Sequence, residues 1–173
     1  VVFLLDMSAS TAEAIDEGRQ VVDDRDAPDD PVEYMVWLRR RREGLVRRNY
    51  KRIIDLEKES TALLINALEA IGDTYGIYGF SGYGRENVEF YVIKDINESF
   101  SDKVTRRIDK ITPLHATRMG AAIRHAISKL DNQQATTKIM FLISDGRPQD
   151  RGYRREGVEK EYAVHDTHMA LIE

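Results

Sequence analysis

The chain of 173 residues contains no cysteine. This excludes a disulfide scaffold, a thiol nucleophile and thiolate ligation of a metal. A reducing compartment fits this composition, and we expect the protein to be cytoplasmic. No apolar run approaches the roughly 20 residues that a membrane-crossing helix needs, so the sequence predicts no membrane partner.

A strong excess of basic charge is also absent. The net charge is -4, and 32% of the residues are charged, whereas a dedicated nucleic-acid binder needs a strongly basic face. DNA or RNA is therefore not expected as the main partner. No glycine-rich loop ends in Lys-Ser or Lys-Thr, so the chain lacks the phosphate-binding loop of P-loop ATPases.

The length fits one domain with a continuous core. One section, at about 18–52, interrupts it with an Asp-rich block at 23–33 and an Arg-rich block at 39–52. The Arg-rich block is consistent with binding to nucleic acid or an acidic protein, or with simple charge attraction to the Asp-rich block. We predict a single domain over 1–173 that carries this charged insertion.

Hydrophobic patterns predict alternating strands and helices. Continuous apolar runs at 1–5 and 139–143 are typical of buried parallel strands, and short β-branched and aromatic runs at 77–81 and 88–93 predict a hairpin. Helical spacing of apolar residues predicts helices at 56–71, 101–111, 119–130 and 162–172. This order favours an α/β, doubly wound and mainly parallel sheet with one antiparallel edge strand and helices on both faces.

Oxygen-bearing side chains follow both predicted buried strands. Asp6, Ser8 and Ser10 alternate after the first strand, and Asp145 follows the second. In a parallel sheet such loops meet at the carboxyl ends of the strands, where ligands bind. Hard cations prefer oxygen ligands, so the pattern predicts a site for Mg²⁺, or for Mn²⁺ or Ca²⁺. Hydroxyls with few carboxylates would leave the cation drawn to an anionic oxygen of another molecule.

The segments Asp6-x-Ser8-x-Ser10, Thr117 and Asp145-Gly146 resemble the metal-ion-dependent adhesion site (MIDAS) of von Willebrand factor A (VWA) domains. The resemblance implies a Rossmann-like VWA fold in which Ser8, Ser10 and Thr117 contact the metal directly. Asp6 and Asp145 would act directly or through water. The remaining coordination position would accept an Asp or Glu of a partner protein.

A narrower resemblance involves four runs, 79–81, 91–95, 117–126 and 145–148. They look like the C-terminal VWA domain of CbbO and NorD proteins, which are adaptors of MoxR-type AAA+ ATPases. This implies a non-catalytic module that grips a client carboxylate, in rubisco activation or in nitric-oxide reductase activation. The run 87–95 favours the rubisco branch. The closing strands of a VWA domain are not found after the last predicted helix, so we expect a domain truncated at its C-terminus. Because the chain opens on a strand and closes in a helix, we expect the native polypeptide to continue on both sides.

Asp6 is also consistent with catalysis, as the nucleophile of a metal-dependent hydrolase or phosphotransferase. That chemistry normally needs a second carboxylate two residues on, to serve as acid or base. Ser8 occupies that position, which favours metal binding over catalysis.

Overall fold

A computed structural model of the chain describes residues 1–13, 15, 30, 33, 35–36, 51–84, 86–146, 148 and 159–173, with only the backbone at 159–160. The chain forms two compact units: Val1–Glu13 with Ile53–Glu173, and Ala14–Arg52. Most of the predicted insertion at 18–52, including most of its two charged blocks, lies outside the described residues. The larger unit contains all five residues predicted as metal ligands.

The larger unit is built on a four-stranded sheet with the strand order β3-β2-β1-β4. The strands are β1 (Val2–Asp6), β2 (Gly76–Gly82), β3 (Val88–Lys94) and β4 (Met140–Ile143). β1 pairs in parallel with both β2 and β4, and β3 pairs antiparallel with β2. The predicted hairpin and the mainly parallel sheet with one antiparallel edge strand are confirmed.

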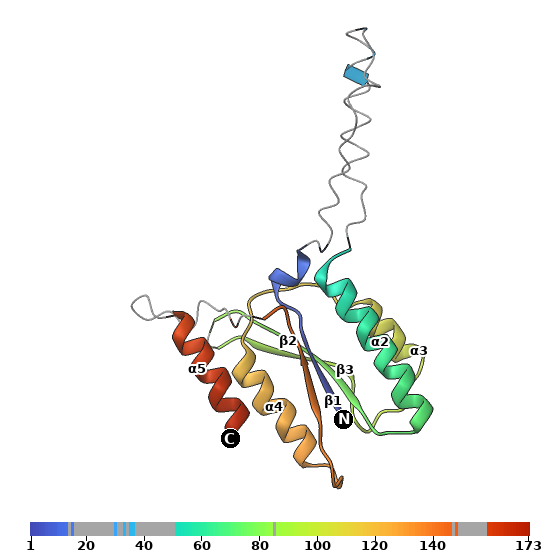
Figure 1. Ribbon diagram of the computed structural model, residues 1–173, viewed down its shortest axis with the longest axis vertical. Helices are drawn as coiled ribbons and strands as arrows, with labels where there is room; N and C mark the ends of the chain where they lie inside the picture. Colours follow the sequence, from blue (N-terminus) through green and yellow to red (C-terminus); the bar gives the residue numbers. More distant parts are fainter. Residues whose placement is uncertain are drawn as a thin grey trace. The chain divides into compact units, whose positions relative to one another are not determined.

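Helices cover both faces of this sheet. They are the 3-10 turn η1 (Ala9–Ala12), α2 (Ile53–Ile71), α3 (Asp102–Asp109), α4 (Met119–Asp131) and α5 (Glu159–Ile172). Figure 1 shows α2 and α3 on one side of the strands and α4 and α5 on the other. The four predicted helices are therefore present, and the fold is a doubly wound α/β domain.

The core is divided between the two faces because side chains alternate along a strand. Val2 and Leu4 of β1 join a cluster with α4 and α5, whereas Phe3 and Leu5 join a cluster with α2 and α3. All five residues of β1 are buried. β1 is thus one of the two inner strands, and its last residue, Asp6, lies between the two helical layers.

The buried face of α2 differs from the face that its leucines suggest. Leu63 and Ile71 are 71% and 70% exposed, although their spacing helped to predict the helix. The buried positions are instead Ile54, Glu57, Thr61 and Ile65. Apolar residues occur on more than one side of this helix, so spacing alone identified the helix but not the side that packs on the sheet.

The prediction that residues 139–143 form a fully buried strand is wrong in one respect. The strand is present as β4, but Phe141 is 44% exposed and Ile139 is 43% exposed. β4 lies at one edge of the described sheet, so fewer neighbours cover it than cover β1. In the part of the chain that the structure describes, no helix combines the length and the apolar character needed to cross a membrane.

Candidate metal site at the carboxyl ends of the strands

The loop after β1 is held in place by its own backbone and side chains. The Met7 amide donates to the Phe80 carbonyl at 2.9 Å, which continues the pairing of β1 with β2 by one residue. The Ser8 amide donates to Asp6 Oδ1 at 2.9 Å, and the Thr11 hydroxyl donates to the Ser8 carbonyl at 2.7 Å. These bonds close the tight turn η1 and keep the Asp6–Ser10 segment at the end of the sheet.

A second loop, residues 114–117, crosses the ends of β1 and β2. The Leu114 amide donates to the Met7 carbonyl at 2.7 Å, and the Ala9 amide donates to the His115 carbonyl at 2.6 Å. Ala116 then forms an isolated bridge with Gly82 at the end of β2. Thr117 follows this bridge directly and is only 2% exposed. The loop that carries Thr117 is therefore tied to the loop that carries Ser8 and Ser10.

The third loop follows β4 and contacts Asp6 through Ser144. The Ser144 hydroxyl donates to Asp6 Oδ2 at 2.8 Å, and the Gly146 amide donates to Ser144 Oγ at 3.1 Å. Gly146 has a φ of 122°, a conformation that favours glycine. This turn holds Asp145 beside Asp6, near enough for its charge to act on the Asp6 carboxyl.

Asp6 ends β1, and the other four residues predicted as metal ligands lie in three loops at the same end of the sheet. Asp6, Ser8 and Thr117 are buried, whereas Ser10 and Asp145 are exposed. The hydroxyls of Ser8 and Ser10 are hydrogen-bonded to each other at 2.9 Å. The five predicted ligands therefore form a group that is buried on the side of the core and open to solvent on the other side.

The chemistry of these donors suits a hard cation. Within the described part of the chain, no three His, Asp or Glu side chains form a group able to hold a metal ion. A cation at this end of the sheet would need the hydroxyls of Ser8, Ser10 and Thr117 as well as the carboxylates. Oxygen ligands of this kind suit Mg²⁺, Mn²⁺ and Ca²⁺ and do not suit softer metals.

The buried carboxyl group of Asp6 dominates the electrostatics at this site. Burial raises the pKa of Asp6 and the charge of Asp145 raises it further, while hydrogen bonds from Ser144 and Ser8 act in the opposite direction. The net direction is upward, because desolvation disfavours the charged form. A positive charge placed here would offset both effects.

Two residues at the site were not predicted from the sequence. Ser144 orients Asp6, and its place directly after β4 and before Asp145 was the available signal. The second residue is Glu57 of α2, which is 6% exposed and whose Oε2 has no hydrogen-bond partner in the described structure. Burial, followed by the charges of Asp6 and Asp145, raises the pKa of Glu57 to about 8. No signal in the sequence identified Glu57, because the helical pattern did not show which side of α2 is buried.

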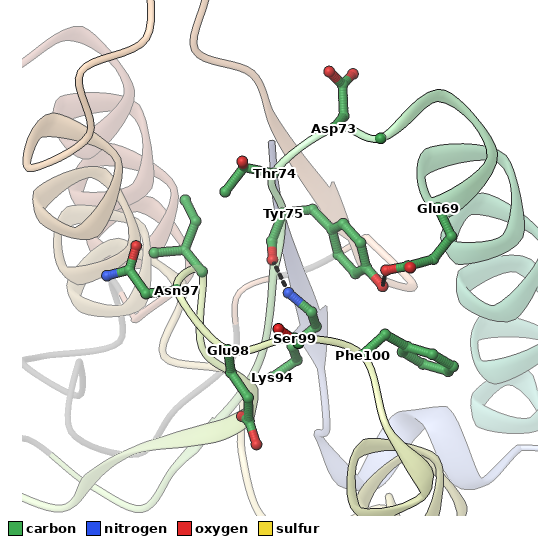
Figure 2. A pocket seen from close by; sticks show the side chains of 11 residues that line it. Glu69, Asp73, Thr74, Tyr75, Lys94, Asn97, Glu98, Ser99 and Phe100 are labelled. Carbon is green, nitrogen blue, oxygen red and sulfur yellow. Dashed lines mark hydrogen bonds between the residues drawn. The ribbon is translucent and has the colours of Figure 1, made fainter.

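A separate pocket of about 410 Å³ lies at the opposite end of the sheet. Figure 2 shows Lys94 pointing to the carbonyl of Tyr75, to which its Nζ donates at 2.6 Å. The same Nζ lies 4.0 Å from the centroid of the Tyr75 ring, and burial lowers the pKa of Lys94. No residue predicted as a metal ligand lines this pocket. These contacts give Lys94 a structural role, because they tie the end of β3 to Tyr75, the residue directly before β2.

The fold and the site together define an α/β domain with oxygen-bearing loops at the carboxyl ends of its parallel strands. Residues 42–147 match the family model of the von Willebrand factor type A domain. The chain belongs to this family. The matched range includes Thr117 and Asp145, and it begins after the Asp6–Ser10 segment.

Several curated relatives are similar over most of this chain. An uncharacterized protein of Pseudomonas aeruginosa is 40% identical over 123 residues, which are 71% of this chain and 19% of that protein. Protein NorD of Stutzerimonas stutzeri is 36% identical over 125 residues, 72% of this chain and 20% of that protein. Protein NorD of Brucella abortus is 38% identical over 123 residues, 71% of this chain and 19% of that protein. The chain spans about a fifth of the length of these relatives.

Among solved structures, a mutant of the PilB minor pilin from Streptococcus sanguinis has a similar fold. The TM-score is 0.62 at 16% sequence identity, and the alignment covers 98% of this chain and 45% of that chain. This likeness supports the α/β fold alone.

Proposed function

We propose that this chain is a non-catalytic, metal-dependent protein-binding module of an adaptor for an AAA+ ATPase. The observation that carries the proposal is the convergence of three loops at the carboxyl ends of β1 and β4. Ser8 and Asp6 are joined by one hydrogen bond, and Ser144 and Asp6 by another. Metal-dependent protein binding is a function that such an arrangement of hydroxyls and carboxylates supports.

The three hydroxyls of Ser8, Ser10 and Thr117 would hold the cation directly. Both oxygens of Asp6 already accept hydrogen bonds, from the Ser8 amide and the Ser144 hydroxyl. Held in place by these two bonds, Asp6 would act directly through a remaining lone pair or through water, and as a fixed negative charge. Asp145 is exposed and lies on the side from which a partner would approach. The bound cation would supply a positive centre that accepts a carboxylate oxygen.

The same hydrogen bonds disfavour the catalytic alternative. Asp6 is 0% exposed, so a phosphoester has no open path to its carboxylate. The hydrogen bonds from the Ser8 amide and the Ser144 hydroxyl also fix the Asp6 carboxylate in place and reduce the negative charge available for attack. Metal binding with a partner's Asp or Glu as the outside ligand explains the open side of the site better.

The proposed partners are a client protein with an exposed carboxylate and, through the remainder of the parent protein, a MoxR-type ATPase hexamer. The relatives named NorD support the nitric-oxide reductase branch, whereas the run 87–95 favoured the rubisco branch. Both clients therefore belong in the test. A cytoplasmic location is part of the same proposal.

The test is a pull-down of each candidate client with the full-length parent protein, in Mg²⁺ and in EDTA. We expect one client to bind in Mg²⁺ and to be released by EDTA. The Ser8→Ala variant should lose this binding, while Ser128→Ala, at an exposed serine of α4, should retain it. Client binding that EDTA leaves unchanged would refute metal dependence. Phosphoester turnover that Asp6→Asn abolishes would support the catalytic alternative instead.

A further inference from the structure

Glu57 is a buried carboxylate with an unpartnered oxygen. It is on the face of α2 that packs on the sheet, in line with Ile54, Thr61 and Ile65, and it is 6% exposed. Its Oε2 has no hydrogen-bond partner among the described residues. An ionised carboxylate in such a place is strongly unfavourable unless a positive charge or hydrogen-bond donors compensate it.

The neighbouring side chains of α2 do not provide this compensation. The hydroxyl of Thr61, one turn further along, donates to the backbone carbonyl of Glu57 at 2.7 Å, so its hydrogen is already engaged. Ile54 and Ile65 belong to the apolar cluster between α2, α3 and the sheet. An apolar residue at position 57 would extend that cluster.

The charges that act on Glu57 come from the candidate metal site. The Ile53 amide donates to the Glu13 carbonyl at 3.0 Å, so α2 begins directly beside the turn that carries Ser10. After burial, the charges of Asp6 and Asp145 are the next causes that raise the pKa of Glu57. Asp6 comes from the end of β1, Asp145 from the loop after β4 and Glu57 from the first turns of α2. One cation near Asp6 and Asp145 would also offset the charge of Glu57.

We propose that Glu57 is a further carboxylate of this metal site, outside the direct ligands, and that it acts on the cation through water. This inference rests on the proposed function, because it needs a cation at the site. Glu57 is not assigned as a direct ligand, because the described residues contain no group of three His, Asp or Glu side chains able to hold a metal ion. Carboxylates in such an outer position orient ligands and tune the charge of the metal.

Glu57 in this role would also affect partner binding. With Glu57 acting through water, three carboxylates would influence the cation, so the cation would be retained more strongly but would attract an incoming acid less. Replacing Glu57 by a neutral residue should therefore weaken binding of the cation. The same change should strengthen binding of a client carboxylate once the site is saturated with metal.

The test is the affinity for Mn²⁺, measured by electron paramagnetic resonance on the full-length parent protein. Glu57→Gln keeps the shape and removes the charge, and we expect it to weaken Mn²⁺ binding about 10- to 100-fold. Glu59→Gln makes the same charge change at an exposed position of α2 and should change the affinity less than about twofold, since exposed charges are screened. Glu57→Met, of similar length and apolar, should weaken Mn²⁺ binding to the same extent and covers the case in which the glutamine variant does not fold.

The outcomes separate the two proposals. If Ser8→Ala loses Mn²⁺ while Glu57→Gln and Glu57→Met bind it as tightly as the unmodified protein, the role of Glu57 is refuted and the metal site stands. If the unmodified protein binds no Mn²⁺, both proposals fail. A loss in Glu57→Gln that Glu59→Gln shares equally reflects net charge alone and also refutes the specific role of Glu57.

Discussion

The stability of the metal-free protein should fall as the pH rises, and Glu57 should account for much of the fall. The ordinary pKa of a glutamate is 4.5, and in the folded chain the pKa of Glu57 is raised to about 8. Between these pH values the folded state retains a proton that the unfolded state has lost. Raising the pH therefore favours the unfolded state over this window. The raised pKa of Asp6 acts in the same direction.

The size of the effect is set by the shift in pKa. Each pKa unit corresponds to about 1.4 kcal/mol, so a rise from 4.5 to about 8 sets an upper limit of roughly 5 kcal/mol. Solvent reaches the open side of the site at Ser10 and Asp145 and screens part of this cost. We expect a loss of about 2–3 kcal/mol in the free energy of unfolding between pH 5 and pH 9.

The assay is urea unfolding in EDTA, followed by far-ultraviolet circular dichroism, at several pH values from 5 to 9. Glu57→Gln should equal the unmodified chain at pH 5 within about 0.5 kcal/mol and exceed it by about 2–3 kcal/mol at pH 9. Glu59→Gln should follow the unmodified chain throughout. Parallel pH profiles for the unmodified chain and Glu57→Gln would refute the reasoning, as would a stability that rises from pH 6 to pH 9.

Three further substitutions test the packing by the shift in the urea midpoint. Gly120→Ala would place a Cβ against the Asp166 carboxylate where α4 meets α5, and we expect a loss of about 1–3 kcal/mol; an unchanged midpoint would mean that the helices separate easily. Lys94→Met removes the bond to the Tyr75 carbonyl and the contact with its ring, and should cost about 1–3 kcal/mol. Ile123→Ala, at a fully buried position, should cost about 2–5 kcal/mol, and a loss below 1 kcal/mol would contradict its place in the core.

Much of the fold was predictable because its patterns are local. Apolar runs before Asp6 and before Ser144 predicted two parallel strands, and the spacing from Met119 to Leu130 predicted α4 with its buried side. The parallel topology then implied that the loops after the strands meet at one end. The candidate ligands lie at the end of β1 or in such loops, and the structure brings these segments together.

The sequence by itself determined the order of strands and helices and the residue types available to a cation, since both depend on neighbours within a few positions along the chain. Only the tertiary structure decided that α2 buries Glu57 while Leu63 faces solvent, and that Ser144 orients Asp6. The tertiary structure also decided that β4 is only partly buried. The burial and the electrostatic surroundings of a side chain are set by the segments that pack against it, and those segments are distant in sequence. For that reason a glutamate in an ordinary helical pattern became a candidate for the site only once the structure showed it buried on the sheet-facing side of α2.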